Sequence, residues 1–188
     1  MGLTNFADVS RYQAWELGRD LATHLHCHLA QFVLPQTWAD LSFIAVAKGP
    51  GSFTGTRIGV VTARTLAQQF ELPLFAFSTL AILAWSQVLA GVTRETVIAV
   101  EMPGRSDEVF AGIYQASQTG LVALFPDTVL SVQEWQQVLK GWSMDYHRVQ
   151  DSNSFSADAA CRALLDLAYQ SWLQGNRPDW SDALPFYN

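Results

Sequence analysis

Hydrophobic positions in the first half of the chain follow the spacing of helices and of buried strands in turn. Leucines recur at four-residue intervals and predict an amphipathic helix over about 11–34, capped by Ser10 and stopped by Pro35. Short apolar runs rich in β-forming residues predict buried strands at 41–48, 73–78 and 95–101. Helical spacing lies between these runs, over about 54–70 and 78–91. Strands that alternate with helices indicate an α/β fold with a largely parallel sheet.

The pattern changes in the second half of the chain. Two runs around a glycine turn predict antiparallel strands, at 108–117 and 120–131. A Ser131/Glu134 capping box predicts the start of another helix, and a last helix is predicted from about 157 to 173. We therefore expect two subdomains, an N-terminal α/β unit over residues 1–103 and a smaller C-terminal α+β unit over residues 104–188.

Composition narrows the class of protein further. The 188 residues are 49% hydrophobic and 15% charged, which indicates a folded globular protein. The formal net charge is −6 and the chain has only two lysines, so a stand-alone nucleic-acid binder is disfavoured. Cys27 and Cys161 form no pattern typical of a disulfide scaffold or a zinc site. The most apolar run, 72–85, is too short to cross a bilayer, and we expect a cytoplasmic protein with no membrane association.

A glycine-rich segment, AKGPGSFTGTRIG at 47–59, follows the first predicted strand after the long helix and opens the next helix. Strand, glycine turn and helix is an arrangement that often binds phosphate. The P-loop pattern fails because Pro50 stands at its first glycine and no lysine follows Gly55; the dinucleotide fingerprint fails because Thr54 replaces its third glycine. An anion at the helix N-terminus remains physically possible, but we predict no cofactor. The loop residues are Gly49, Pro50, Gly51, Ser52, Phe53 and Thr54.

Small residues recur every four positions along the helix that this loop opens. They are Gly55, Gly59, Ala63 and Ala67. Such a ridge lets another helix approach at backbone distance. Arg57 and Arg64 lie together on another face of the helix, where they can pair with carboxylates of a partner. Two alternatives stay open: the stripe packs within the chain, or it forms a partner interface.

Catalytic or metal-ligating groupings are sparse. His24 and His28 lie at i and i+4 on the first predicted helix, a spacing that can bind a metal ion. A zinc site needs further ligands and Cys27 points away from that face, so we expect a helix surface and predict no metal. No Ser/His/Asp or Cys/His arrangement stands out, and we predict no catalytic residue.

Four segments together resemble one known family. GPGSFTGTRIG at 49–59 matches ten of the eleven positions of GPGSFTGLRIG, the signature of the TsaB (YeaZ) family, with Thr56 in place of leucine. ARTLAQQFELPLFAFSTLA at 63–81 extends the likeness, as does the stretch 15–41. MPGRSDEVFAGIY at 102–114 is similar to the D-A-R-x-x-E-V-Y segment of the family, although Pro103 replaces the aspartate. The cyanobacterial members are the most similar.

This resemblance implies an actin-like, Hsp70-like fold of the ASKHA, ribonuclease H-like kind, here in a reduced form. Members of the family open with a strand of the type I-L-A-[IL]-[DH]-T-S, followed by a second strand. This chain begins at MGLTNFADVSR, which resembles only the end of that second strand. We therefore expect an N-terminally shortened member whose first sheet lacks its first strand.

The resemblance also implies a function as a partner of the catalytic subunit TsaD, in making threonylcarbamoyladenosine (t6A) in tRNA, and as a subunit that enables the ATPase TsaE to bind. In the family the two proteins dimerise through their first helices, here about 11–34 and 54–70. The implied interface residues are Gly55, Arg57, Gly59, Ala63 and Arg64. The tRNA is then contacted only through the complex, and the chain alone can form a homodimer.

Two classes of function follow. The magnesium-binding aspartate and the adenosine-binding glycine turn of the wider superfamily have no match here, so we expect a non-catalytic scaffold subunit. The alternative is a stand-alone enzyme, either an ASKHA-type phosphotransferase or ATPase, or a glycoprotease-like peptidase. Such an enzyme would hydrolyse ATP or cleave a peptide by itself.

Overall fold

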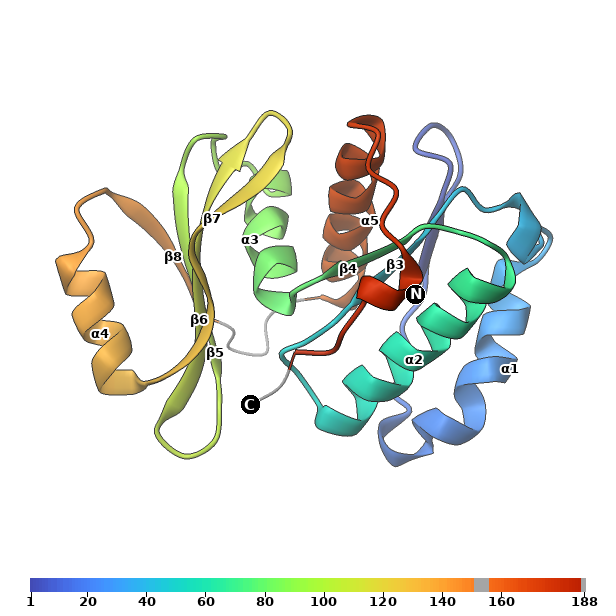
Figure 1. Cartoon of the computed structure of the whole chain (residues 1–188), viewed down its shortest axis with the longest axis horizontal. Coiled ribbons are helices and arrows are strands. Elements are labelled where there is room, and N and C mark those ends of the chain that lie inside the picture. Colours follow the sequence, from blue (N-terminus) through green and yellow to red (C-terminus); the bar gives the residue numbers. More distant parts are fainter. Residues whose placement is uncertain (151–155, 187–188) are drawn as a thin grey trace.

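The computed structural model describes residues 1–150 and 156–186, and its elements stack in layers that Figure 1 shows edge-on. The layers run from α4 through a four-stranded sheet to α3 and α5, then to β3 and β4, and finally to α2 and α1. The elements are β1 (Gly2–Thr4), β2 (Ser10–Tyr12), α1 (Leu21–Val33), β3 (Ile44–Ala47), α2 (Phe53–Gln69), β4 (Leu74–Phe77), α3 (Thr79–Leu89), β5 (Val97–Pro103), β6 (Glu108–Ser117), β7 (Gly120–Ser131), α4 (Val132–Gly141), β8 (Tyr146–Gln150) and α5 (Ala157–Leu173).

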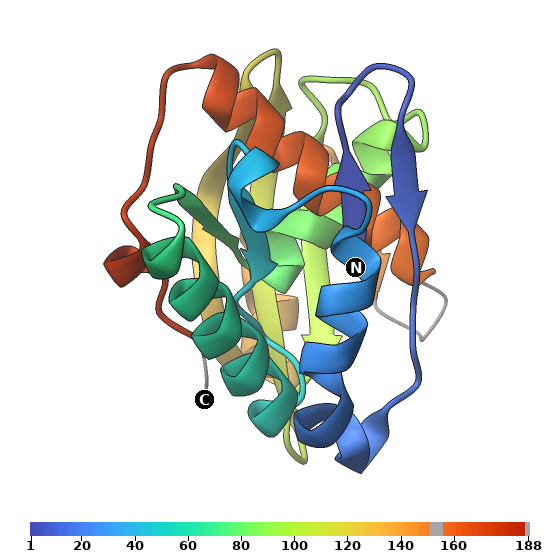
Figure 2. The ribbon, with the colours of Figure 1, turned by 90° about the vertical axis from the view of Figure 1, so that its right-hand side faces the viewer.

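The described strands form three sheets. β1 and β2 make an antiparallel hairpin, and β3 and β4 pair in parallel. The remaining sheet has the order β7-β6-β5-β8, in which β5 is antiparallel to β6 and parallel to β8, and we call this four-stranded sheet the second sheet. Figure 2 looks onto the α1 and α2 side and shows β3 and β4 behind these helices, with the β1–β2 hairpin at the upper right above α1.

Strand β5 is buried on both of its faces, and its side chains alternate between two helical layers. Val97 and Ala99 pack toward Trp135 of α4. Ile98 and Val100 pack toward α3 on the other face. This alternation joins the second sheet to the middle of the molecule, because α3 in turn packs on α5.

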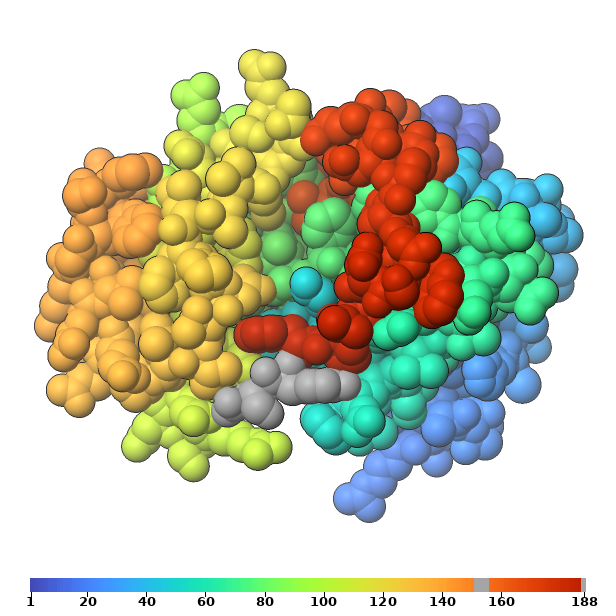
Figure 3. All heavy atoms as spheres, in the orientation of Figure 1, coloured from blue at the N-terminus to red at the C-terminus, as the bar shows by residue number. Residues whose placement is uncertain are grey.

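The end of the chain returns to the β3–β4 side of the molecule. The Leu74 N–H donates to the Pro178 carbonyl at 3.1 Å, and the Phe186 N–H donates to the Lys48 carbonyl at 2.7 Å. Ala183 is buried in the same cluster as α2 and β4. Figure 3 shows this segment, in red, lying beside α2. Residues 44–77 and residues 178–186 therefore pack together on one side of the molecule.

The predicted first helix is wrong at its start. Ser10 caps no helix, because Ser10–Tyr12 is strand β2 and pairs with Gly2–Thr4. The Arg11 guanidinium holds this strand against the far end of α1, where it donates to the Leu34 carbonyl and, at 2.7 Å, to the Gln36 side chain. The helix proper begins at Leu21 after a single 3-10 turn.

The strand predicted at 95–101 exists, but it does not continue the parallel pair. Its structural counterpart β5 starts the second sheet and pairs with β6 and β8. Strand β8 was not predicted from the sequence. The sheet also runs across the expected boundary near Gly104, since β5 lies before it and β6 after it. The division into units 1–103 and 104–188 stays a prediction.

Several local signals are confirmed. β6 and β7 have the bounds that the pattern predicted, and α5 covers the predicted 157–173. The Ser131 hydroxyl accepts from the Glu134 N–H at 3.2 Å, while the Glu134 carboxylate accepts from the Ser131 N–H at 2.9 Å. Within residues 1–150 and 156–186, no helix has both the length and the apolar character that crossing a bilayer requires.

Candidate functional site: the glycine loop and the outer face of α2

The glycine loop joins β3 to α2 and begins the helix with a side-chain cap. The Ser52 hydroxyl accepts a hydrogen bond from the Gly55 N–H at 3.3 Å, as expected for an N-cap residue. Gly51, Ser52, Phe53 and Thr54 are exposed, whereas Gly49 and Pro50 are buried. The loop thus presents its second half to solvent and anchors its first half inside the protein.

Gly49 occupies a position that accepts no other residue without strain. Its φ of +98° lies in the region that side chains rarely adopt, and a Cβ atom there would stand 2.6 Å from the Phe186 backbone oxygen. The Gly49 carbonyl accepts from the Thr79 N–H at 2.8 Å. The loop is therefore fixed between α3 and the end of the chain.

The small-residue stripe of α2 faces the protein's own elements. Ala63 and Ala67 are buried and pack with Leu74 and Ala183. A Cβ on Gly55 would lie 3.7 Å from Leu21 of α1, and Gly59 borders a cavity between the helices and β3. In this structure Ala63 packs within the chain, which is one of the two alternatives that the sequence left open. A partner role for the stripe stays a prediction.

The two arginines of α2 differ in their surroundings. Arg64 is half-buried; its guanidinium carbon lies 5.5 Å from the centre of the Trp180 ring, and it donates to the Ala183 carbonyl at 3.4 Å. Arg57 is exposed and lies 5.1 Å from the centre of the Phe53 ring. Of the two arginines, Arg57 is the more exposed, and a role of the pair at a partner interface stays a prediction.

Exposed side chains on the solvent side of α2 also recur every four residues. Phe53 and Val61 are 52% and 59% exposed, and with Arg57 and Thr65 they form one row, which we call the outer face. The neighbouring helix α1 contains no Asp, Glu, Lys or Arg. Val61 was not singled out from the sequence, because its place in this row follows only once the buried side of α2 is known.

The histidines of α1 lie close together without forming a larger grouping. The His24 and His28 ring centres are 6.3 Å apart, and His28 lies 4.7 Å from the Trp15 ring. In the described ranges, no three His, Cys, Asp or Glu side chains are arranged to hold a metal ion. Cys27 lies exposed on α1 and Cys161 lies on α5, both as free thiols on the separate helices that the sequence predicted.

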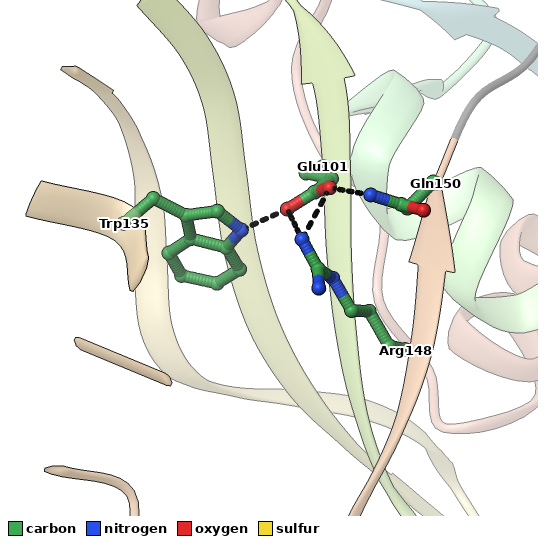
Figure 4. Close-up of polar contacts among 4 residues, drawn as sticks. All are labelled: Glu101, Trp135, Arg148 and Gln150. Atoms are coloured by element: carbon green, nitrogen blue, oxygen red, sulfur yellow. Dashed lines mark hydrogen bonds and ion pairs between the residues drawn. The ribbon is translucent and has the colours of Figure 1, made fainter. Parts of the chain in front are cut away.

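A buried carboxylate that was not predicted from the sequence lies on β5 in the second sheet. Glu101 is 8% exposed and accepts hydrogen bonds from the Trp135 indole, the Gln150 amide and Arg148, as Figure 4 shows. The Arg148 guanidinium donates to both carboxylate oxygens, at 2.9 and 3.1 Å. These contacts connect α4, β5 and β8, so the group stabilises the sheet. An acid inside an apolar strand was the signal available in the sequence.

A second polar contact lies on the opposite face of that sheet. The buried Tyr114 hydroxyl donates to Asp127 of β7. Burial raises the pKa of the Tyr114 phenol far above its ordinary value, and the Asp127 carboxylate raises it further. A phenol held in its protonated form donates this hydrogen bond throughout the neutral range.

Comparisons with known proteins agree with this architecture. A protein-family model described as "TsaD: tRNA N6-adenosine threonylcarbamoyltransferase" matches residues 29–171, which include the glycine loop, the β3–β4 pair and the four-stranded sheet. The solved structure "YeaZ from Pseudomonas aeruginosa" superimposes with a TM-score of 0.68 at 26% identity, over 96% of this chain and 89% of that one. The fold is therefore of the actin-like, Hsp70-like class that the TsaD and YeaZ proteins share.

Two curated relatives narrow the assignment. "tRNA threonylcarbamoyladenosine biosynthesis protein TsaB" of Escherichia coli (strain K12) is 30% identical over 168 residues, which are 79% of this chain and 71% of that protein. The protein of the same name from Bacillus subtilis (strain 168) is 40% identical over 101 residues, 54% of this chain. That match spans 42% of the Bacillus protein's own length. The chain belongs to the TsaB (YeaZ) family.

Proposed function

We propose that the chain is a non-catalytic subunit of the machinery that makes t6A in tRNA. In this role it dimerises with the catalytic subunit TsaD in the cytoplasm and enables the ATPase TsaE to bind. The names of the Escherichia coli and Bacillus subtilis relatives support the assignment to t6A biosynthesis. The proposed roles of this chain toward TsaD and TsaE rest on the resemblance of its glycine-loop motif to that of the family.

The observation that carries the proposal is the outer face of α2. Phe53 and Val61 expose apolar surface on a helix that packs into the protein's own core through Ala63 and Ala67. Arg57 adds one positive charge in the same row, and α1 beside it contributes no formal charge. Apolar and aromatic residues with a single arginine are typical of the central part of protein–protein interfaces.

The charge of the chain supports an indirect role toward tRNA. With a net charge of −6, the protein offers little attraction for the phosphate backbone, so the complex rather than this chain holds the nucleic acid. The outer face also permits a homodimer when the partner is absent. No cofactor takes part in this proposal.

The test is a charge placed in the middle of the outer face. Val61→Arg should abolish co-elution with TsaD of the same species, because an arginine at an interface centre is buried without a partner. The matched control is Val122→Arg on β7, where a valine of similar exposure, 54%, lies far along the chain in the second sheet. Both variants should unfold at the temperature of the parent protein. If Val61→Arg still co-elutes normally, the outer face of α2 is not the interface.

A second measurement separates this proposal from the enzymatic alternative. The purified chain should neither hydrolyse ATP nor cleave a peptide when TsaD and TsaE are absent. Turnover by the chain alone, retained in Val61→Arg, would establish a stand-alone enzyme and overturn the scaffold role.

A further inference from the structure

Two histidines of α1 lie one helical turn apart on the surface of the protein. His24 and His28 occupy positions i and i+4, and the centres of their rings are 6.3 Å apart. His24 is exposed, and His28 is half-buried. Figure 2 shows α1, in blue, at the front of the molecule. We call these two residues the histidine pair.

The spacing of the histidine pair is that of a chelate on one helix face. Two imidazoles at i and i+4 can bind one ion together, each through a single ring nitrogen. With nitrogen–metal bonds of about 2.1 Å, the ring centres of two such ligands lie roughly 5 Å apart. The histidine pair is therefore close to that geometry, and rotation about the side-chain bonds of the exposed His24 supplies the remaining change.

Trp15 already holds the second histidine of the pair in place. The Trp15 ring centre lies 4.7 Å from that of His28, and the same ring meets Phe32 edge-on at 5.9 Å. A side chain that is packed in this way has little rotamer freedom left to lose when a ligand binds, which lowers the entropic cost of binding. One ligand is thus fixed in advance and the other can adjust to the ion.

The charges around the histidine pair are compatible with a cation. The helix itself contains no Asp, Glu, Lys or Arg, and the nearest cation in the sequence, Arg19, is exposed to solvent. Asp20 lies one turn before His24, and its carboxylate forms no capping hydrogen bond to the helix. A histidine that binds a metal commonly donates its other ring N–H to a carboxylate, which orients the ring. Asp20 can accept this hydrogen bond from His24.

We propose that His24 and His28 bind one late transition-metal dication, of the Zn²⁺, Ni²⁺ or Cu²⁺ type, with water at the remaining positions. Imidazole nitrogen suits these ions, whereas Mg²⁺ and Ca²⁺ prefer oxygen ligands. Among the described residues no third His, Cys, Asp or Glu completes a metal-binding group, so the site is open, unlike a closed structural zinc site. An ion that joins two positions one turn apart binds the folded helix and thereby stabilises it. This inference does not depend on the proposed function.

The probe is nickel chloride, titrated into the full chain without an affinity tag and followed by calorimetry. One Ni²⁺ should bind per chain. His24→Ala and His28→Gln should each weaken binding about tenfold or more, because each removes one of the two protein ligands. The matched control is His26→Ala. His26 is exposed on the same helix but lies two positions from each ligand, on another face, so this variant should bind Ni²⁺ as the parent does.

Thermal unfolding separates metal binding from an effect on the fold. Ni²⁺ should raise the unfolding temperature of the parent protein and of His26→Ala, but not that of His24→Ala. Without metal, His24→Ala should unfold at the parent temperature, because His24 is exposed. Magnesium chloride should have no such effect. Cys27→Ser should still bind Ni²⁺, because the exposed thiol of Cys27 is not one of the two ligands.

Four results would overturn the inference. Undiminished binding by His24→Ala would place the ion elsewhere. Equal losses in His26→Ala and His24→Ala would mean that surface imidazoles bind the ion without a defined site. Loss of binding in Cys27→Ser would assign the ion to the thiol. Absence of binding by the parent protein at about 1 mM Ni²⁺ would exclude the site even if His28→Gln failed to fold.

Discussion

Arg64 lies over the indole ring of Trp180, with the guanidinium carbon 5.5 Å from the ring centre, and thereby ties α2 to the end of the chain. Replacing Arg64 with alanine removes this cation–π contact and the bond to the Ala183 carbonyl, and should lower the free energy of unfolding by about 1 kcal/mol. Arg57→Ala should change it by less than about 0.5 kcal/mol, because Arg57 is exposed. Chemical denaturation measures both.

The variants Arg57→Ala and Arg64→Ala also distinguish an effect on folding from an effect on partner binding. Under the proposed function, Arg57→Ala weakens co-elution with TsaD and reduces its salt dependence. Arg64→Ala weakens co-elution only to the extent that it destabilises the folded protein. A normal stability of Arg64→Ala together with lost co-elution would reverse these assignments.

The glycine loop should tolerate no side chain at Gly49. Gly49→Ala combines a positive φ with a close approach to the Phe186 backbone oxygen, and we expect a loss of about 2 kcal/mol or more. Gly175→Ala is the matched control, since Gly175 has φ +85° but no atom within 4 Å of the added Cβ. It should lose only about 1 kcal/mol. Equal losses in thermal unfolding would show that the contact with Phe186 adds nothing.

Removing Arg148 should leave a buried carboxylate without its cation. Arg148→Met is expected to cost about 1 to 3 kcal/mol, toward the lower end because 43% of the arginine side chain is exposed. Adding Glu101→Gln to that variant removes the uncompensated charge and should recover part of the loss. A double-mutant cycle by urea denaturation tests this, and strictly additive losses would contradict coupling between the two residues.

Tyr114 should make the protein less stable at alkaline pH. Because the pKa of its phenol is raised in the folded state, the unfolded chain loses this proton first, near pH 10. The folded state then holds more protons, so the free energy of unfolding falls as pH rises, by up to about 1.4 kcal/mol per pH unit. Tyr114→Phe should show a shallower fall in denaturation curves collected through about pH 10. An unchanged slope would rule out Tyr114 as its source.

What could be predicted from the sequence depended on how locally each feature is determined. The Ser131/Glu134 box and helix α5 follow from residues a few positions apart, and both were predicted correctly. The start of α1 was not, because Leu17 keeps the leucine spacing while pairing with β1 turns Ser10–Tyr12 into a strand. Strand β8 escaped detection because it is an edge strand in which only Val149 is buried.

The buried side of α2 could not be predicted from the local pattern either, because it depends on residues far away in the sequence. Its stripe of small residues marks a close approach, but whether the approaching surface is internal depends on Leu74, Ala183 and Trp180. Two of these lie more than a hundred residues further along the chain. The family motif identified the loop without saying which side of its helix is covered.

The return of α5 and of residues 178–186 to the β3–β4 side has a consequence for synthesis on the ribosome. β4 emerges roughly 100 residues before α5 is complete, so at about 5–20 residues per second the apolar side of the β3–β4 pair stays uncovered for several seconds or longer. During that time the second sheet, whose strands and helix α4 lie between these segments, can form first. We therefore expect the nascent chain to bind a chaperone before its N-terminal part, which is synthesised first, has finished folding.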